Sequence, residues 1–167
     1  MSNFVSENYI KNELKVLNKN IDGNQILMYV NTSEMFNLRP ILGNYFYNYL
    51  LSAYTAQSLT ADEENLVLLI KPAVAYRASS KAAFFLAGQL TNKGPQTQFS
   101  DNSSPTSDTY MYKLSAELRS YAEASENDIR EWLKEYKDLY ANYTSELNKV
   151  LGKPDTRNNF DSGVFII

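Results

Sequence analysis

The chain has 167 residues, a formal net charge of −3, and neither cysteine nor histidine. This length fits a single domain that can bury a core, and the absence of cysteine excludes a disulfide framework and a thiolate metal site. Without histidine, the usual general base and the commonest transition-metal ligand are missing. Acidic and basic residues are mixed along the chain without a lysine/arginine cluster, which argues against a protein that binds nucleic acid through its phosphates.

Catalytic motifs are absent from the sequence as well. It has no glycine-rich phosphate loop and no Asp-x-Asp-x-Asp-Gly calcium loop. Asp62, Glu63 and Glu64 are adjacent carboxylates, but capping and the helix dipole explain acidic residues in a first helical turn. We therefore expect a protein that is not an enzyme and that holds no cofactor or metal ion.

The first third of the chain predicts short helices. Residues 6–17 have an amphipathic pattern that Ser6 can cap, residues 22–24 indicate a turn, and residues 31–33 are a candidate interruption of the helix that follows. Pro40 suits the first position of the next helix and should push Arg39 toward an extended conformation. In that helix we expect Gly43 to allow the close approach of a neighbour and Tyr47 to lie away from the core. The apolar residues at helical spacing are Ile41, Leu42, Tyr45, Phe46, Tyr49 and Leu50.

Residues 60–90 predict the helix at the centre of the fold. Thr60 and Glu63 form a capping box, so the helix should begin beside Ala61. From residue 66 to residue 90 the run is apolar on more than one face, which is typical of a helix packed on several sides. Pro72 should kink this helix or split it in two. Two lysines and an arginine near its middle make a membrane span too costly.

A polar segment and a second long helix follow the central helix. Residues 91–107 are rich in Gly, Pro, Ser and Thr, which predicts a loop that is mobile or held by a partner. From Asp108 the chain is predicted to be helical again, with a fresh cap at Ser125 and an apolar stripe that continues to Val150. Gly152 and Pro154 should stop that helix.

The last residues form an apolar, strand-prone tail that has to be covered. Its own domain could cover it, or it could dock on another subunit by strand addition or in an apolar pocket. The resulting fold prediction is an all-α helical bundle of residues 1–153 with a central Pro-kinked apolar helix and a long polar loop at 91–107. An extended C-terminal tail, residues 154–167, completes the chain.

Four stretches carry a resemblance to a known family. They are residues 39–51 (RPILGNYFYNYLL), 59–64 (LTADEE), 68–76 (LLIKPAVAY) and 93–95 (KGP). Together they resemble small structural proteins of tailed phages, found in crAss-like phages and Bacteroides prophages. Those proteins are head–tail connectors or adaptors, the ring subunits bound beneath the portal.

The resemblance implies a non-enzymatic structural subunit of a ring, typically twelvefold, at the head–tail junction of the virion. Its partners would be further copies of itself, the portal protein and an adjacent ring or tail protein, assembled in the host cytoplasm without a membrane. The genome would pass through without sequence-specific binding. The docking tail would comprise Phe160, Val164, Phe165, Ile166 and Ile167, the inter-subunit loop Lys93, Gly94, Pro95 and Phe99, and one inter-subunit face Tyr45, Tyr47 and Tyr49.

Two other functions stay open from the sequence. A helical adaptor or regulator that binds a protein partner as a monomer or dimer would form a small particle in solution, with its tail packed on its own domain. A DNA-binding helical module would need a basic face that the sequence lacks, together with a steep salt dependence of DNA binding.

Overall fold

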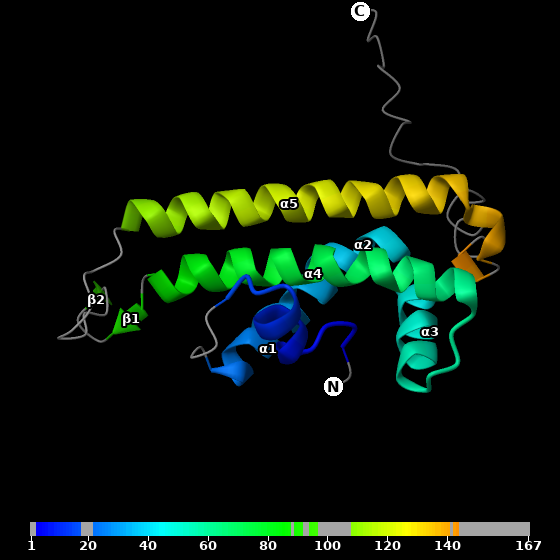
Figure 1. The fold of residues 1–167 in the computed structure, drawn as a ribbon, viewed down its shortest axis with the longest axis horizontal. Helices are drawn as coiled ribbons and strands as arrows, with labels where there is room; N and C mark the ends of the chain where they lie inside the picture. Colours follow the sequence, from blue (N-terminus) through cyan, green and yellow to red (C-terminus); the bar gives the residue numbers. More distant parts are fainter. Residues whose placement is uncertain are drawn as a thin grey trace, which may run out of the picture.

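The computed structural model describes residues 3–17, 22–87, 89–91, 94–96, 108–140 and 142–143. The fold is mainly helical, which confirms the predicted all-α class, and it adds one short β-hairpin (Figure 1). Three short segments are π-helical (η1, η2) or 3-10 helical (η3). In chain order the elements are η1 (Tyr9–Glu13), α1 (Gly23–Ser33), η2 (Glu34–Leu38), α2 (Arg39–Leu42), α3 (Asn44–Thr55), α4 (Ala61–Ala87), β1 (Gln89–Thr91), β2 (Gly94–Gln96), α5 (Asp108–Glu135) and η3 (Lys137–Leu139).

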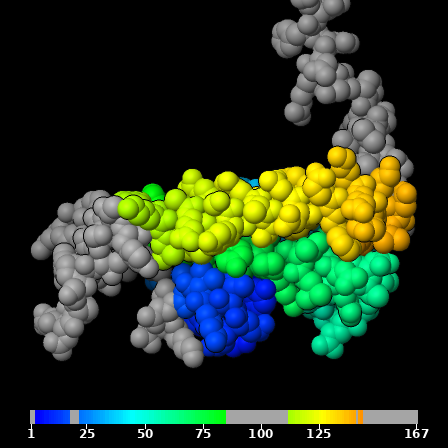
Figure 2. Space-filling view, turned by 45° about the horizontal axis from the view of Figure 1, so that its top comes forward, coloured from blue at the N-terminus to red at the C-terminus, as the bar shows by residue number. Residues whose placement is uncertain are grey.

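Helix α4 is the centre of the fold, as its apolar faces predict. It packs along α5 on one side and against α1 on another, and α4 and α5 lie side by side over most of their length (Figure 1). Figure 2 shows α5 along the surface of the molecule, with its outer side open over most of its length. The largest fully buried apolar side chains are Phe4, Phe46, Ile10, Ile26, Leu38, Leu42, Leu50, Leu66, Ile70, Ile129 and Leu133.

The start of α4 follows the capping-box prediction. The Thr60 amide donates to Glu63 Oε2 at 2.9 Å, and the Glu63 amide donates to Thr60 Oγ1 at 3.3 Å. The helix then runs unbroken past Pro72 to Ala87, so a split into two helices is wrong. Buried residues on both sides of the proline, including Ile70 and Ala73, hold the helix together by tertiary packing. A kink at Pro72 stays a prediction.

The segment before α3 is more continuous than predicted. The Asp22 carboxylate accepts a hydrogen bond from the Asn24 amide at 2.9 Å, so the expected turn is instead the capped start of α1. Residues 31–33 do not interrupt that helix, which passes directly into η2 and α2. Arg39 is helical, with φ −57° and ψ −39°, and not extended. The burial of neighbouring Leu38 and Leu42 in the core outweighs the local preference of a residue before proline.

Gly43 separates α2 from α3. Its backbone has φ 78° and ψ 151°, a conformation that is almost restricted to glycine. A Cβ atom at this position would meet nothing within 4 Å, so the predicted close approach of a neighbour is wrong. The glycine is needed for the change of chain direction between the two helices.

Helix α5 differs from its prediction in two places. Ser125 lies inside the helix and its hydroxyl donates to the Tyr121 carbonyl at 3.0 Å, so the fresh cap predicted there is wrong. The helix ends at Glu135 and does not continue to Val150. The reason is tertiary: Tyr140 is buried, and its hydroxyl donates to the Asp62 carbonyl at 3.0 Å and accepts from Trp132 Nε1 at 2.7 Å. These contacts bring the chain back onto the start of α4.

Candidate functional site

The three tyrosines predicted to form one inter-subunit face are not equivalent. Tyr45 and Tyr49 are 49% and 37% exposed. Tyr47 is buried at 5% exposure, so its assignment to the surface is wrong. The π-helical turn η2 brings Glu34 beneath Tyr47, and the phenol donates a hydrogen bond to Glu34 Oε2 at 2.8 Å.

Glu34 is the centre of a buried polar cluster. Its carboxylate is 2% exposed and also accepts a hydrogen bond from the Phe4 amide at 2.8 Å, so it ties the N-terminal segment to α3. Arg39 lies 4.7 Å from the centroid of the Tyr47 ring. Burial raises the pKa of Glu34 above its ordinary value, although the hydrogen bonds from Tyr47 and Phe4 act in the opposite direction. The cluster is enclosed by the core, so its role is structural.

Replacing Glu34 should change how stability depends on pH. Because the folded-state pKa of Glu34 is raised, the native protein holds this proton more tightly than the unfolded chain. Glu34 should therefore contribute a loss of wild-type stability as pH rises from about 4 through its raised pKa, by about 1.4 kcal/mol for each unit by which the two pKa values differ. Glu34→Gln lacks this loss, so its free energy of unfolding relative to wild type should improve over the same range.

Urea unfolding of both proteins at several pH values measures this difference. Glu131→Gln, an exposed carboxylate on α5, is the matched control and should follow the wild-type profile. A constant difference between Glu34→Gln and wild type from pH 4 to pH 7 would contradict the prediction.

The other predicted contact residues lie at one end of the molecule or outside the described residues. Gly94 and Pro95 belong to β2, which pairs antiparallel with β1 at the end of α4 opposite to α3 (Figure 1). Lys93 and Phe99 of the predicted loop lie outside the described residues. The same holds for the whole predicted tail, with Phe160, Val164, Phe165, Ile166 and Ile167, and for the domain boundary at residue 153.

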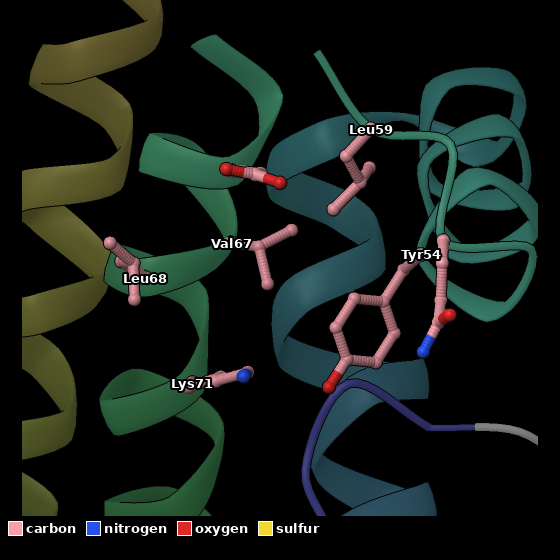
Figure 3. A pocket seen from close by; sticks show the side chains of 7 residues that line it. Tyr54, Leu59, Val67, Leu68 and Lys71 are labelled. Atoms are coloured by element: carbon pink, nitrogen blue, oxygen red, sulfur yellow. The ribbon is translucent and has the colours of Figure 1, made fainter. Parts of the chain in front are cut away.

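An open groove, here called the α3–α4 groove, lies between the end of α3 and the first half of α4. Its volume is about 430 Å³. Figure 3 shows Val67 and Lys71 reaching from α4 toward Tyr54, while Leu68 projects away from that ring. The Lys71 ammonium lies 5.3 Å from the centroid of the Tyr54 ring. The groove is lined by Tyr54, Gln57, Leu59, Glu64, Val67, Leu68 and Lys71.

Leu68 is a surface residue that the sequence did not identify. It is 64% exposed, although its place in an all-round apolar helix predicts burial. A signal was present in the sequence, because its neighbours on the same helical face are Glu64, Asn65 and Lys71. A second exposed apolar surface lies on α1 and η2, where Met28, Met35 and Phe36 are 54%, 52% and 68% exposed. We call these three residues the η2 patch.

A second concavity, the α4–α5 cleft, lies between the later half of α4 and the first half of α5. Its volume is about 400 Å³. Arg77 forms a two-pronged ion pair with Glu126, with both N···O distances 2.8 Å, and it lies 3.6 Å from Glu123. Ser80 and Ser115 hold the two helices close, since each hydroxyl donates to the carbonyl of the other residue, at 2.8 and 2.9 Å. The lining residues are Asn37, Arg77, Ser80, Lys81, Phe84, Ser115, Arg119 and Glu123.

In the described ranges, no three carboxylate side chains gather where they could hold a metal ion. None of the helices that the structure describes is both long enough and apolar enough to span a membrane. The arrangement is that of exposed apolar and mixed-charge surfaces, which suits contacts with other macromolecules.

Comparison with known proteins gives one match. Residues 38–150 match a family described as a family of unknown function (DUF6712), and this range contains every element from α2 to η3. No curated protein and no solved structure matches the chain.

Proposed function

The chain belongs to the DUF6712 family of unknown function, and we propose that it is a non-enzymatic structural subunit of a phage head–tail connector ring. In this proposal it docks on the portal and lines or surrounds the channel through which the genome leaves. The resemblance of residues 39–51, 59–64, 68–76 and 93–95 to such proteins motivates the proposal. A mainly helical fold is compatible with it.

The observation that carries the proposal is the presence of two separate exposed surfaces on one small chain. One is the apolar η2 patch, and the other is the α3–α4 groove, which combines the exposed Leu68 with the polar side chains of Gln57, Glu64 and Lys71. A ring interface is heterologous, so each subunit must offer two different faces that match each other. The η2 patch and the α3–α4 groove meet this need. They lie at different levels of α4, since Asn37 of η2 accepts a hydrogen bond from Lys81 at 3.1 Å, whereas the groove reaches only to Lys71.

The charge distribution also suits a passage for DNA. The net charge is −3 and both signs are mixed along the sequence without a lysine/arginine cluster, whereas a run of basic residues would bind phosphates and slow the genome. Tyr45 and Tyr49 remain candidates for contacts with a neighbour, because tyrosine is common in interfaces and both rings are exposed.

Light scattering coupled to size exclusion tests the proposal on the full chain mixed with the portal protein of the same genome. The wild type should co-elute with the portal in a ring-sized complex. Phe36→Glu and Leu68→Glu each place a charge on an exposed apolar side chain, so they should weaken the complex while preserving the helical circular dichroism signal. Ser120→Glu, an exposed position on α5 outside both surfaces, should behave as wild type.

The contrary result is equally clear. If the wild type does not bind the portal and all variants run as the same small species, the connector proposal is wrong. The helical adaptor that acts as a monomer or dimer would then be the better account.

A further inference from the structure

Two cations in the α4–α5 cleft have no carboxylate partner of their own. Lys81 is partly buried, and its ammonium donates to the neutral Asn37 amide oxygen at 3.1 Å. Arg119 has no hydrogen bond or ion pair with any residue that the structure describes. The nearest carboxylates are already engaged, since both oxygens of Glu126 bind Arg77 and Glu123 lies 3.6 Å from the same guanidinium.

The surroundings of Lys81 make this arrangement unfavourable without an anion. Burial and the neighbouring Arg77 guanidinium both lower the pKa of Lys81, while the Glu126 carboxylate raises it to a smaller extent. A carboxylate from another molecule would stabilise the charge of Lys81 through a hydrogen bond. Because Lys81 is partly buried, this ion pair would be screened less than a pair at the surface. The cleft is therefore suited to an acidic group.

The rim of the cleft is aromatic. Phe84 is 45% exposed, and its ring centroid lies 5.7 Å from that of Tyr112, which is 54% exposed. Exposed rings near two cations that lack a carboxylate partner favour a ligand that combines a carboxylate with apolar side chains. A phosphate group or a purely acidic peptide would leave the rim uncovered.

We propose that the α4–α5 cleft binds residues 155–167 of a second copy of this chain, with the Asp161 carboxylate against Lys81 and Arg119. This segment has the required chemistry, because Asp161 stands between Phe160 and the apolar run 164–167. Its apolar side chains would cover Phe84 and Tyr112. The segment carries two aspartates and one arginine, so its charge complements the cleft.

The cleft lies at the end of the subunit opposite to Tyr140. The segment between residues 140 and 160 could span about 66–72 Å if extended, so it is long enough to reach the cleft of its own copy, and the reason for preferring a second copy is head-to-tail packing. Tyr140 holds the end of the described chain at Asp62, the start of α4, whereas Phe84 lies about 33 Å further along that helix at 1.5 Å per residue. Figure 1 shows these two ends of α4 on opposite sides of the molecule. In a head-to-tail assembly, opposite ends of successive copies meet. The inference rests on the proposed association of copies and is independent of the portal.

Photo-crosslinking of the full chain without the portal tests this contact. A benzophenone side chain replaces Phe160, and the protein is an equal mixture of isotopically light and heavy copies. Mass spectrometry should find crosslinks from position 160 to peptides with Phe84 or Tyr112, half of them between light and heavy copies if exchange is free. The proposal would be overturned if the crosslinks form only within single copies or only to other surfaces. It would also be overturned if no crosslink from position 160 forms.

Charge variants test the role of Lys81. Lys81→Glu should lower the yield of crosslinks roughly tenfold, which corresponds to about 1.4 kcal/mol, because it removes a charged hydrogen bond and places two carboxylates together. Adding Asp161→Lys to this variant should restore the yield, which also shows that Lys81→Glu is folded. Lys113→Glu, on α5 outside the cleft, is the matched control and should not change the yield. A double variant that stays at the low yield contradicts the pairing.

Two further results separate this inference from the proposed function. In the first, a benzophenone in place of Phe99 forms crosslinks to the cleft and one in place of Phe160 does not. This result would assign the cleft to a different segment and overturn the inference. Portal binding without crosslinks to the cleft would also refute the inference while leaving the connector proposal intact. Crosslinks between copies in a protein that does not bind the portal would support the inference and contradict the connector.

Discussion

Arg77→Met should lower the free energy of unfolding by about 3–5 kcal/mol, because it leaves the Glu126 carboxylate buried without its partner. The side chains of Arg77 and Glu126 are only 11% and 9% exposed, and their ion pair joins α4 to α5 through two hydrogen bonds of 2.8 Å. Solvent can therefore do little to replace the lost guanidinium. Urea unfolding followed by circular dichroism measures the loss.

A second substitution separates the cost of an unpaired charge from the value of the pair. Arg77→Met combined with Glu126→Leu should recover most of the lost stability, because replacing both partners of a buried pair by apolar residues is often close to neutral. Arg130→Met is the control, because Arg130 is exposed on α5, the helix of Glu126, and donates a hydrogen bond to Asn127 Oδ1 at 2.8 Å. This variant should cost about 0.5 kcal/mol or less. A loss below about 1 kcal/mol for Arg77→Met would contradict the buried geometry.

Phe46→Ala should cost about 3–5 kcal/mol of unfolding free energy, the usual range for removing a buried aromatic ring. Phe46 is fully buried, and its ring centroid lies 5.7 Å from that of Tyr140 and 5.5 Å from that of Tyr143. The ring thus supports the chain after α5 where it returns to α3 and α4. Its removal should leave a cavity below Tyr140 that the surrounding helices cannot fully close.

The only tryptophan of the chain reports on this change directly. Trp132 donates its indole N–H to the Tyr140 hydroxyl at 2.7 Å, so loosening Tyr140 should expose the indole and shift its native-state emission to longer wavelength. Tyr45→Ala, at an exposed position of the same helix, should cost less than about 1 kcal/mol and leave the emission unchanged. A large loss of stability with unchanged emission would show that Phe46 does not hold Tyr140 in place.

These two sites matter for the proposed function because they fix the long α4–α5 pair as one rigid element. The Arg77 ion pair joins the helices beside the α4–α5 cleft, and Phe46 joins α3 to the returning chain at the other end. A ring subunit needs such rigidity, since its two contact faces must keep a fixed angle for the ring to close.

The sequence by itself determined the features that depend on neighbouring residues. The capping box at Thr60 and Glu63 placed the start of α4 correctly, because both of its hydrogen bonds form within one helical turn. The apolar spacing also identified Ile129 and Leu133 as parts of one helical stripe, and both are buried. The all-α class followed from such local patterns.

Only the tertiary structure decided which faces are covered and where elements end. Tyr47 is buried because Glu34, from η2, lies beneath its hydroxyl. Helix α5 ends at Glu135 because Tyr140 binds the backbone of Asp62. Each outcome depends on contacts between residues far apart in the chain, and helical periodicity carries no information about which neighbour will cover a given face.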